Sequence, residues 1–349
     1  MTDGETGTAT RGRSRTQSRE RRLEAPHRRG GASPRVVERL AVVGYRLTTW
    51  SLSVLPAGPM AALVGRFAQL SYLLWPTKRR WSNRNFGHVL GLPPSDPRVR
   101  RMALRAYLEY GRYLVEVMRL PSRTPEQMAA MVPVLDTDGL LRIAGESRGG
   151  MIYTVGHVGS NDAVMAAIAR HGMPISVVAD DSSFPELFEL LRRQREQRGA
   201  TVIAWRNLRE IFGVLRRREM LALLVDWGYR ADGIPVRLFG AWTALPAGPA
   251  TLAAKSGSTI LPVTIRRQPD DTFSVAWTEP ITVASSDPAE LQRATQAIAD
   301  ALERTIGAAP EQWYNFKPIW PEDAEEAAEL ERRAALMLAG RPDPGPGGA

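Results

Sequence analysis

The sequence contains no cysteine, which excludes disulfides, thiolate metal sites, iron–sulfur clusters and a cysteine nucleophile. We also expect no metal site built from other residues. No Gly-x-Ser-x-Gly segment stands between a predicted strand and a predicted helix, so a serine hydrolase with a nucleophile elbow is not expected. Helix-turn-helix, RNA-recognition and zinc signatures are absent too, and we therefore expect no nucleic-acid partner. The chain has only four histidines, so few positions could supply a catalytic imidazole.

The formal net charge of +9 is concentrated near the amino terminus. Residues 1–35 hold nine arginines against four acidic residues, in a stretch with very few aliphatic side chains. Such a segment cannot bury enough apolar surface to fold by itself, which predicts a disordered basic tail. Two interpretations stay open, a solvated tail and a tether to an anionic surface. A secretory signal peptide is not expected, because the apolar stretch begins too late and no clean cleavage site follows it.

An apolar stretch at residues 36–76 follows the tail. Prolines at 56 and 59 divide it, which predicts two helices that lie in or re-enter the membrane. A single transmembrane anchor is the alternative, because the uncharged run 47–65 approaches the length of a span. Trp75 and Trp81 then bracket three cations, which predicts an interfacial belt or, alternatively, a helix-ending loop.

Four parts are expected along the chain. They are the tail 1–35, a helical membrane-associating region 36–145, an α/β core 146–321, and a C-terminal helix with a flexible tail, 322–349. The predicted strands are Met151–Val155, Ile175–Ala179, Thr201–Trp205, Met220–Val225, Val236–Phe239, Thr259–Ile265 and Phe273–Trp277. Residues 97–145 before the core are predicted to be helical, with clear periodicity over 101–120 and an end at Pro121, and helices are predicted within the core at 163–170, 184–198, 208–217, 248–255 and 288–306. Strands alternating with helices predict an α/β fold with a central mixed sheet flanked by helices.

The best candidate for chemistry is His157, which lies in a glycine-rich turn just after the strand Met151–Val155. The carboxyl ends of strands are where α/β sheets place their ligands. Asp162 follows at the start of the next predicted helix, where a carboxylate is electrostatically favoured. We expect the turn to bring this carboxylate to one imidazole nitrogen, leaving the other as a general base. The alternatives are that Asp162 only caps its helix and that His157 is a core residue.

Four segments, taken together in their order between residues 36 and 320, resemble the bacterial acyltransferase family of lipid A lauroyl/myristoyl transferases and phosphatidylinositol mannoside acyltransferases. The segments are Gly156-His157-Val-Gly159-Ser-Asn161-Asp162; Arg195-Glu-Gln-Arg198-Gly199; the run from Leu224-Val225-Asp226 through Asp232-Gly233 and Phe239-Gly240 to Gly248-Pro249 and Pro262; and Pro310-Glu-Gln-Trp313 with Trp320. In two respects the chain departs from its relatives. Asn161 stands where relatives often carry tryptophan, and no glutamate is found at or near Pro235 or Arg237.

The resemblance implies a glycerol-3-phosphate acyltransferase-like fold and an O-acyltransferase that needs no cofactor. His157 would act as the base and Asp162 would orient it, while backbone N–H groups of the Gly159 turn would stabilise the oxyanion. Arg195 or Arg198 would bind a phosphate of the donor or acceptor, the alternative being an ordinary solvated helix face. The role of the missing glutamate is either absent or supplied by Asp226 or Asp232. Gly159, Asn161 and these four charged residues are thus the expected substrate-binding residues.

The expected partners are acyl-CoA or acyl carrier protein as donor, a membrane lipid as acceptor, and an anionic membrane surface. An Ala/Arg/Gly/Pro-rich composition, typical of GC-rich bacterial genomes, favours a phosphatidylinositol mannoside acceptor. A lipid A-type or another lysophospholipid acceptor is the alternative. An inactive membrane-binding module is a further alternative from a different class. The expected location is the cytoplasmic face of the inner or plasma membrane.

Overall fold

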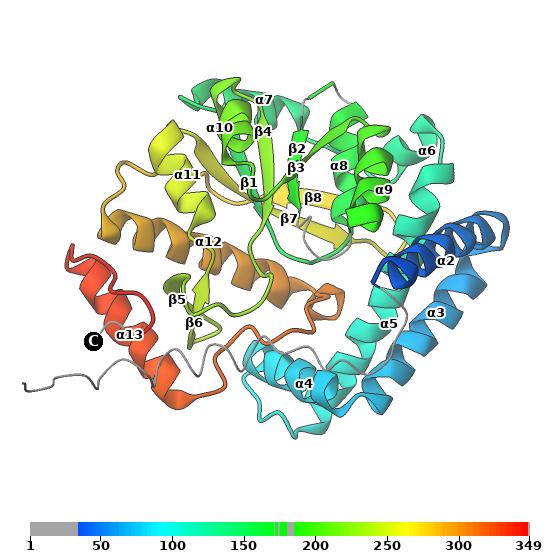
Figure 1. Cartoon of the computed structure of the whole chain (residues 1–349), viewed down its shortest axis with the longest axis horizontal. Coiled ribbons are helices and arrows are strands. Elements are labelled where there is room, and N and C mark those ends of the chain that lie inside the picture. The colour runs from blue at the N-terminus through cyan, green and yellow to red at the C-terminus, as the bar shows by residue number, and fades with distance from the viewer. Residues whose placement is uncertain (1–33, 171, 174, 180–184, 348–349) are drawn as a thin grey trace, which may run out of the picture.

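The computed structural model describes residues 34–170, 172–173, 175–179 and 185–347, so most of the predicted tail 1–35 lies outside it (Figure 1). Its centre is a six-stranded sheet with the strand order β3-β2-β4-β1-β7-β8. All neighbouring strands in this sheet are parallel except β7 and β8. The strands are β1 (Met151–Val155), β2 (Ile175–Ala179), β3 (Ala200–Ala204), β4 (Met220–Leu224), β7 (Thr259–Arg267) and β8 (Phe273–Trp277). The predicted mixed sheet is therefore confirmed.

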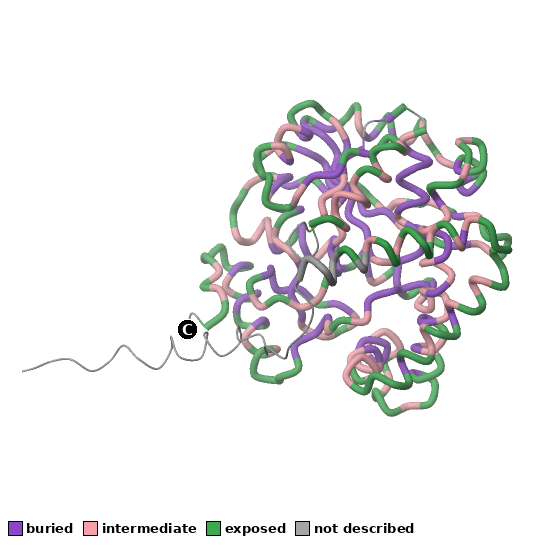
Figure 2. The backbone as a smooth tube through the Cα atoms, turned by 45° about the vertical axis from the view of Figure 1, so that its right-hand side comes forward, coloured by how far each residue is buried: buried purple, intermediate pink, exposed green. Residues whose placement is uncertain are grey.

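Alternate residues of the central strands enter different hydrophobic cores. On β1, Ile152 belongs to one core, and Met151 and Tyr153 belong to the other. Because side chains alternate across a strand, a sheet covered on both faces needs apolar residues at every position. One core includes α10 (Leu208–Arg216), α11 (Gly248–Ser256) and α12 (Pro288–Ala308); the other includes α7 (Thr137–Glu146) and α8 (Asn161–Arg170). Figure 2 shows buried stretches of the chain gathered in the middle of the molecule.

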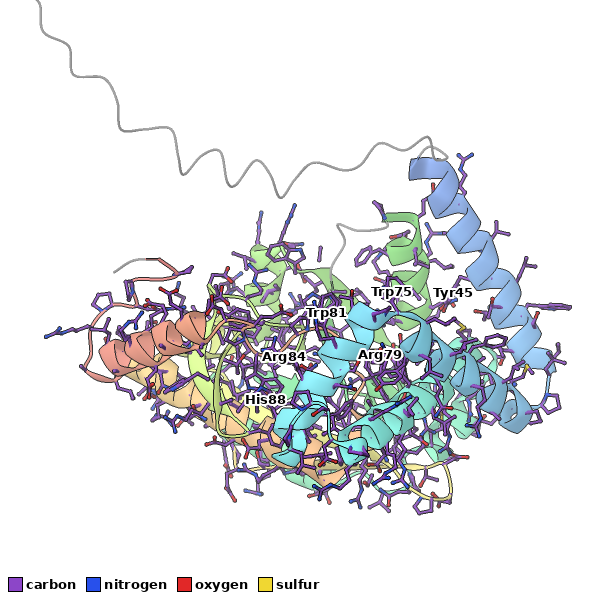
Figure 3. All side chains as sticks on the ribbon, turned by 90° about the horizontal axis from the view of Figure 1, so that it is seen from below. Tyr45, Trp75, Arg79, Trp81, Arg84 and His88 are labelled. Atoms are coloured by element: carbon purple, nitrogen blue, oxygen red, sulfur yellow. The ribbon has the colours of Figure 1, made fainter. Side chains whose placement is uncertain are left out.

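Four long helices precede the sheet: α2 (Pro34–Val54), α3 (Ala57–Leu74), α4 (Pro76–Leu90) and α5 (Pro97–Arg119). The backbones of helices α3 and α5 approach closely at two glycines, since a Cβ on Gly111 would lie 2.3 Å from the Cα of Gly65. Helix α2 in turn packs on α5 and on α9 (Pro185–Glu196), where the Tyr45 hydroxyl donates to Gln194 (Figure 3). These helices are thus part of the folded body.

The remaining elements close the chain around α12. A separate antiparallel pair, β5 (Ile234–Leu238) and β6 (Ala241–Leu245), packs against α12 and α13 (Ala324–Leu338). Short helices η1 (Leu120–Ser122), α6 (Pro125–Ala130) and η2 (Pro310–Gln312) complete the fold. Strand β6 and helix α4 were not predicted. The signal for β6 was the two-residue turn Phe239-Gly240, where both φ angles are positive, as a tight hairpin requires.

The division of residues 36–76 into two helices at its prolines is confirmed. None of the helices among the described residues combines the length and the hydropathy needed to cross a bilayer. Of the two tryptophans in the predicted belt, Trp75 is exposed, while the Trp81 indole donates to Glu322 (Figure 3). Part of that segment therefore faces the protein itself.

Candidate active site

The sheet register brings His157 and Asp226 together. Strands β1 and β4 are parallel neighbours with Val155 opposite Leu224, and the two residues lie at the same distance beyond these strand ends. His157 Nδ1 is 2.6 Å from Asp226 Oδ1, and the His157 backbone N–H donates to Asp226 Oδ2 at 2.9 Å. The carboxylate is sealed, whereas 27% of the histidine side chain is exposed. A buried acid therefore holds an imidazole that remains accessible.

The charges of this pair stabilise one another. Burial opposes ionisation of Asp226, but the neighbouring imidazole and the donors around the carboxylate lower its pKa overall. Burial likewise opposes the imidazolium, but the attraction of Asp226 outweighs it and raises the pKa of His157. An ionised carboxylate only accepts hydrogen bonds, so neutral His157 must donate Nδ1–H to it. The lone pair is then on Nε2, as a general base needs.

The segment that follows α12 fixes both members of the pair. The buried indole of Trp313 donates to Asp226 Oδ2 at 2.8 Å, and the amide of Asn315 donates to the Asp226 backbone carbonyl. The Tyr314 N–H donates to the carbonyl of His157 at 2.8 Å. The closing Pro-Glu-Gln-Trp motif, noticed in the sequence only as a signature, thus has a direct structural role at the pair.

The expected contact between Asp162 and His157 is not formed. Asp162 lies in the first turn of α8, as predicted, but its carboxylate accepts from Arg195 Nε on α9 at 2.8 Å. Burial opposes ionisation of Asp162, and the attraction of Arg195 overcomes it and lowers the pKa. The reason is local geometry. Once the chain enters α8, Asp162 faces α9, whereas the imidazole beyond β1 faces β4. The prediction that Asp162 contacts and orients His157 is therefore wrong, and Asp226 makes this contact with the imidazole instead.

The expected oxyanion donor is also engaged elsewhere. Gly159 adopts φ +66°, and its N–H donates to the carbonyl of Gln312 at 3.2 Å. A Cβ at this position would lie 2.7 Å from the carbonyl oxygen of Ile265, so glycine is needed for close packing. Asn161 donates from its amide to the carbonyl of Gly156 at 3.0 Å and closes the turn. Both residues shape the histidine turn.

The remaining predicted site residues separate into two groups. Arg195 is occupied by Asp162, while Nε and Nη1 of Arg198 are buried without a hydrogen-bond partner in the described part of the chain. Arg198 therefore retains donors for an anion. Asp232 pairs with Arg230 at 2.7 Å on the surface, where both side chains are more than half exposed. Of the two acids considered for the missing glutamate, only Asp226 contacts His157.

The structure contains neither a serine nucleophile elbow nor a cluster of metal ligands within the described residues. Gly145-Glu-Ser147-Arg-Gly149 has the spacing of a nucleophile elbow, but it joins α7 to β1, and Ser147 is buried and donates to the carbonyl of Gly150. A nucleophile elbow requires an exposed serine between a strand and a helix. Within the described ranges, no group of three or more histidine and acidic side chains could hold a metal ion.

Sequence reasoning missed two residues at the site. Trp227 directly follows Asp226; its ring centroid is 5.7 Å from that of His157, and it is 53% exposed. Lys317 Nζ lies 3.8 Å from the centroid of the Trp227 ring. The position of Trp227 after the predicted strand end at Val225 was the available signal, because strand ends border the ligand edge.

Comparison with known proteins identifies relatives of this chain. Residues 36–322 match the model of the bacterial lipid A biosynthesis acyltransferase family. A phosphatidylinositol mannoside acyltransferase of Mycolicibacterium smegmatis is 29% identical over 259 residues, covering 72% of this chain and 82% of that protein. A Mycobacterium tuberculosis protein of the same name is 29% identical over 275 residues, covering 72% and 80%. The matched region contains every element from α3 to η2.

Proposed function

The chain belongs to the bacterial lipid A biosynthesis acyltransferase family, and from this membership we propose that it moves a fatty acyl chain from an acyl thioester to a lipid hydroxyl. The observation that carries the proposal is the partly exposed imidazole of His157 held at 2.6 Å by the sealed carboxylate of Asp226. This arrangement suits proton removal from an alcohol. It also disfavours an inactive module, because a merely structural histidine has no need of a partly exposed ring held by a buried carboxylate.

The reaction needs one proton carrier. His157 Nε2 takes the proton of the acceptor hydroxyl as its oxygen attacks the thioester carbonyl, and Asp226 stabilises the imidazolium that forms. The new C–O bond forms, the C–S bond breaks, and the proton passes from His157 to the departing thiolate. A positioned base contributes about 10²–10⁴-fold to the rate. A thioester is already activated, so no covalent enzyme intermediate is required.

We assign the donor to acyl-CoA or acyl carrier protein and the acceptor to a phosphatidylinositol mannoside. The two mycobacterial relatives carry that acceptor in their names. Arg198 supports an anionic substrate, because its Nε and Nη1 are buried without partners in the described structure. It would contact a phosphate of the donor or of the acceptor. Arg195 would act indirectly, by holding Asp162 and with it the start of α8.

We further propose that the protein binds the cytoplasmic face of the cell membrane peripherally. Supporting this, large apolar side chains are exposed along α2 and α3: Val43, Leu47, Trp50, Val54, Leu63, Phe67, Leu70 and Leu74. Monomeric proteins rarely expose a large apolar patch unless it contacts a partner or a membrane. The cations of α4, Lys78 and Arg79 among them, suit an anionic surface.

Thiol release tests the proposed reaction. Purified full-length protein is mixed with palmitoyl-CoA and vesicles that contain phosphatidylinositol mannoside, and free thiol and acylated lipid are measured. We expect thiol release that requires the acceptor, yields an acylated lipid by mass spectrometry, and is lost in His157→Ala. Release that does not need the acceptor would indicate a hydrolase instead. Lipids that accumulate in a deletion strain would identify the acceptor.

Vesicle binding tests the membrane proposal separately. Truncation is unsuitable, because α3 packs on α5 through Gly65 and Gly111. Substituting Trp50 and Phe67, 65% and 61% exposed, by serine leaves that contact intact. We expect the double variant to lose cosedimentation with anionic vesicles while its melting temperature stays unchanged. Undiminished cosedimentation would show that this surface is not the membrane contact.

A further inference from the structure

We infer that Trp227 is a stacking platform for a sugar or cyclitol ring of the acceptor headgroup, and that Lys317 supplies the positive charge beside it for a phosphodiester. The inference rests on the proposed function, because it names the part of the acceptor that this site recognises. It concerns a residue that takes no proton and makes no bond in the reaction.

Trp227 lies where an acceptor must arrive. Its ring centroid is 5.7 Å from that of His157, with the ring planes inclined at 40°, and it is 53% exposed. A pyranose or inositol ring resting on the indole would therefore have hydroxyls within a few ångströms of the imidazole. A single exposed tryptophan needs no explanation by itself. Its place directly beside a general base is what gives this one a function.

The backbone on both sides of Trp227 is held in place by its surroundings. Asp226 precedes it and is fixed by Trp313, while Gly228 follows with φ +136°, a conformation that side chains rarely adopt. The N–H of Tyr229 donates to the carbonyl of Pro318 at 2.7 Å. Both ends of the loop are thus tied to the segment that carries Lys317. A platform fixed in this way loses little conformational entropy when a ring stacks on it.

The chemistry of the platform favours a polyol over an acyl chain. The face of an aromatic ring is negative, so it attracts cations and the positively polarised C–H groups of a sugar. Lys317 Nζ already uses this attraction over one face of the indole, at 3.8 Å from the ring centroid, so a sugar ring would stack on the opposite face. The charge of Lys317 also opposes protonation of His157, offsetting part of the rise in its pKa due to Asp226. A headgroup that joins a polyol ring to a phosphodiester matches both residues.

A binding measurement tests the platform without turnover. Glycerophosphoinositol is titrated into the full-length protein by calorimetry, with Trp227→Ala, Trp227→Leu and Trp227→Phe as variants. We expect the dissociation constant to rise about ten-fold in the alanine and leucine variants and to change little in the phenylalanine variant. The matched control is Trp205→Ala, since Trp205 is 46% exposed but follows the edge strand β3. Equal affinity in all variants would overturn the inference.

Steady-state kinetics then show whether Trp227 contributes to binding of the acceptor or of the donor. In Trp227→Leu we expect the KM for the glycolipid acceptor to rise about ten-fold, with the KM for palmitoyl-CoA unchanged. Lys317→Met should weaken glycerophosphoinositol binding but not the binding of methyl α-mannoside, which lacks a phosphate. A rise in the KM for palmitoyl-CoA alone would assign Trp227 to the donor and overturn the inference. Trp227-dependent binding without any transfer would instead refute the proposed function and leave the platform standing.

Discussion

Asp226 and Asp162 are buried carboxylates beside the histidine turn, and they have different partners. Asp226 pairs with His157, whose side chain is 27% exposed and can gain or lose a proton. Asp162 pairs with Arg195, which stays charged at any pH the protein meets. Both carboxylates have lowered pKa values, because the attraction of a neighbouring cation outweighs the effect of burial, which would raise the pKa. A perturbed pKa therefore does not by itself distinguish a catalytic acid from a structural one; the partner does.

The largest effect should come from the imidazole. We expect His157→Ala to lower kcat by about 10²–10⁴-fold, because the acceptor hydroxyl loses its base. The folded state should be retained, because the side chain is partly exposed and lies outside the two cores. Thiol release measures the first effect and thermal unfolding the second. If the variant unfolded, His157 would belong to the core and the contrast between the two pairs would disappear.

Removing the charge of Asp226 should be the next largest effect. In Asp226→Asn we expect kcat to fall by about 10²-fold or more, because the ring loses its orientation and the imidazolium its counter-charge. In the wild type, activity should rise with pH through the pKa of His157, since only the neutral ring is a base. Without the carboxylate that pKa falls, so the acid limb of the kcat/KM profile should move to lower pH. An unmoved limb would mean that Asp226 does not act on His157.

The matched change at Asp162 should act on stability. In Asp162→Asn, the Arg195 guanidinium loses its partner, and we expect the free energy of unfolding to fall by about 3 kcal/mol. The kcat of the folded fraction should stay within about ten-fold of the wild type. Urea unfolding and thiol release would measure the two quantities, and Asp162→Leu combined with Arg195→Met should recover part of the stability. A folded Asp162→Asn enzyme without activity would reverse the two assignments.

The smallest effect is expected from removing the hydrogen bond that Trp313 donates to Asp226. Trp313→Phe removes the indole N–H that donates to its carboxylate at 2.8 Å, which should raise the pKa of Asp226 and lower kcat roughly ten-fold. Trp320→Phe is the control, because that buried indole donates to the carbonyl of Leu238 instead. We expect similar losses of stability in both variants but slower turnover only in the first. Equal kcat values in the Trp313→Phe and Trp320→Phe variants would mean that Trp313 contributes only to packing.

Much of the fold could be predicted because many of its helices and strands follow from the pattern of residues close together in the sequence. The strand Met151–Val155, the end at Pro121 of the helix over 101–120 and the helix at 248–255 all agree with the structure. Helix α4 was missed, since its buried face is made by Ser82, Asn85, Phe86 and Gly87, only one of which is a large apolar residue. Strand β6 was missed because its two-residue turn is Phe239-Gly240, which is not one of the pairs, such as Asn-Gly or Asp-Gly, that usually mark a tight hairpin.

From the order of the residues alone it follows that a histidine stands at the carboxyl end of a buried strand, ahead of an acid at a helix start. It also follows that an apolar, proline-divided stretch precedes the α/β pattern. These features depend on residues that are close along the chain. Which acid contacts the imidazole depends instead on the folded arrangement, because parallel pairing of β1 with β4 brings Asp226 to His157 across 69 positions of sequence. Asp162, five positions away, is carried by its helix toward Arg195.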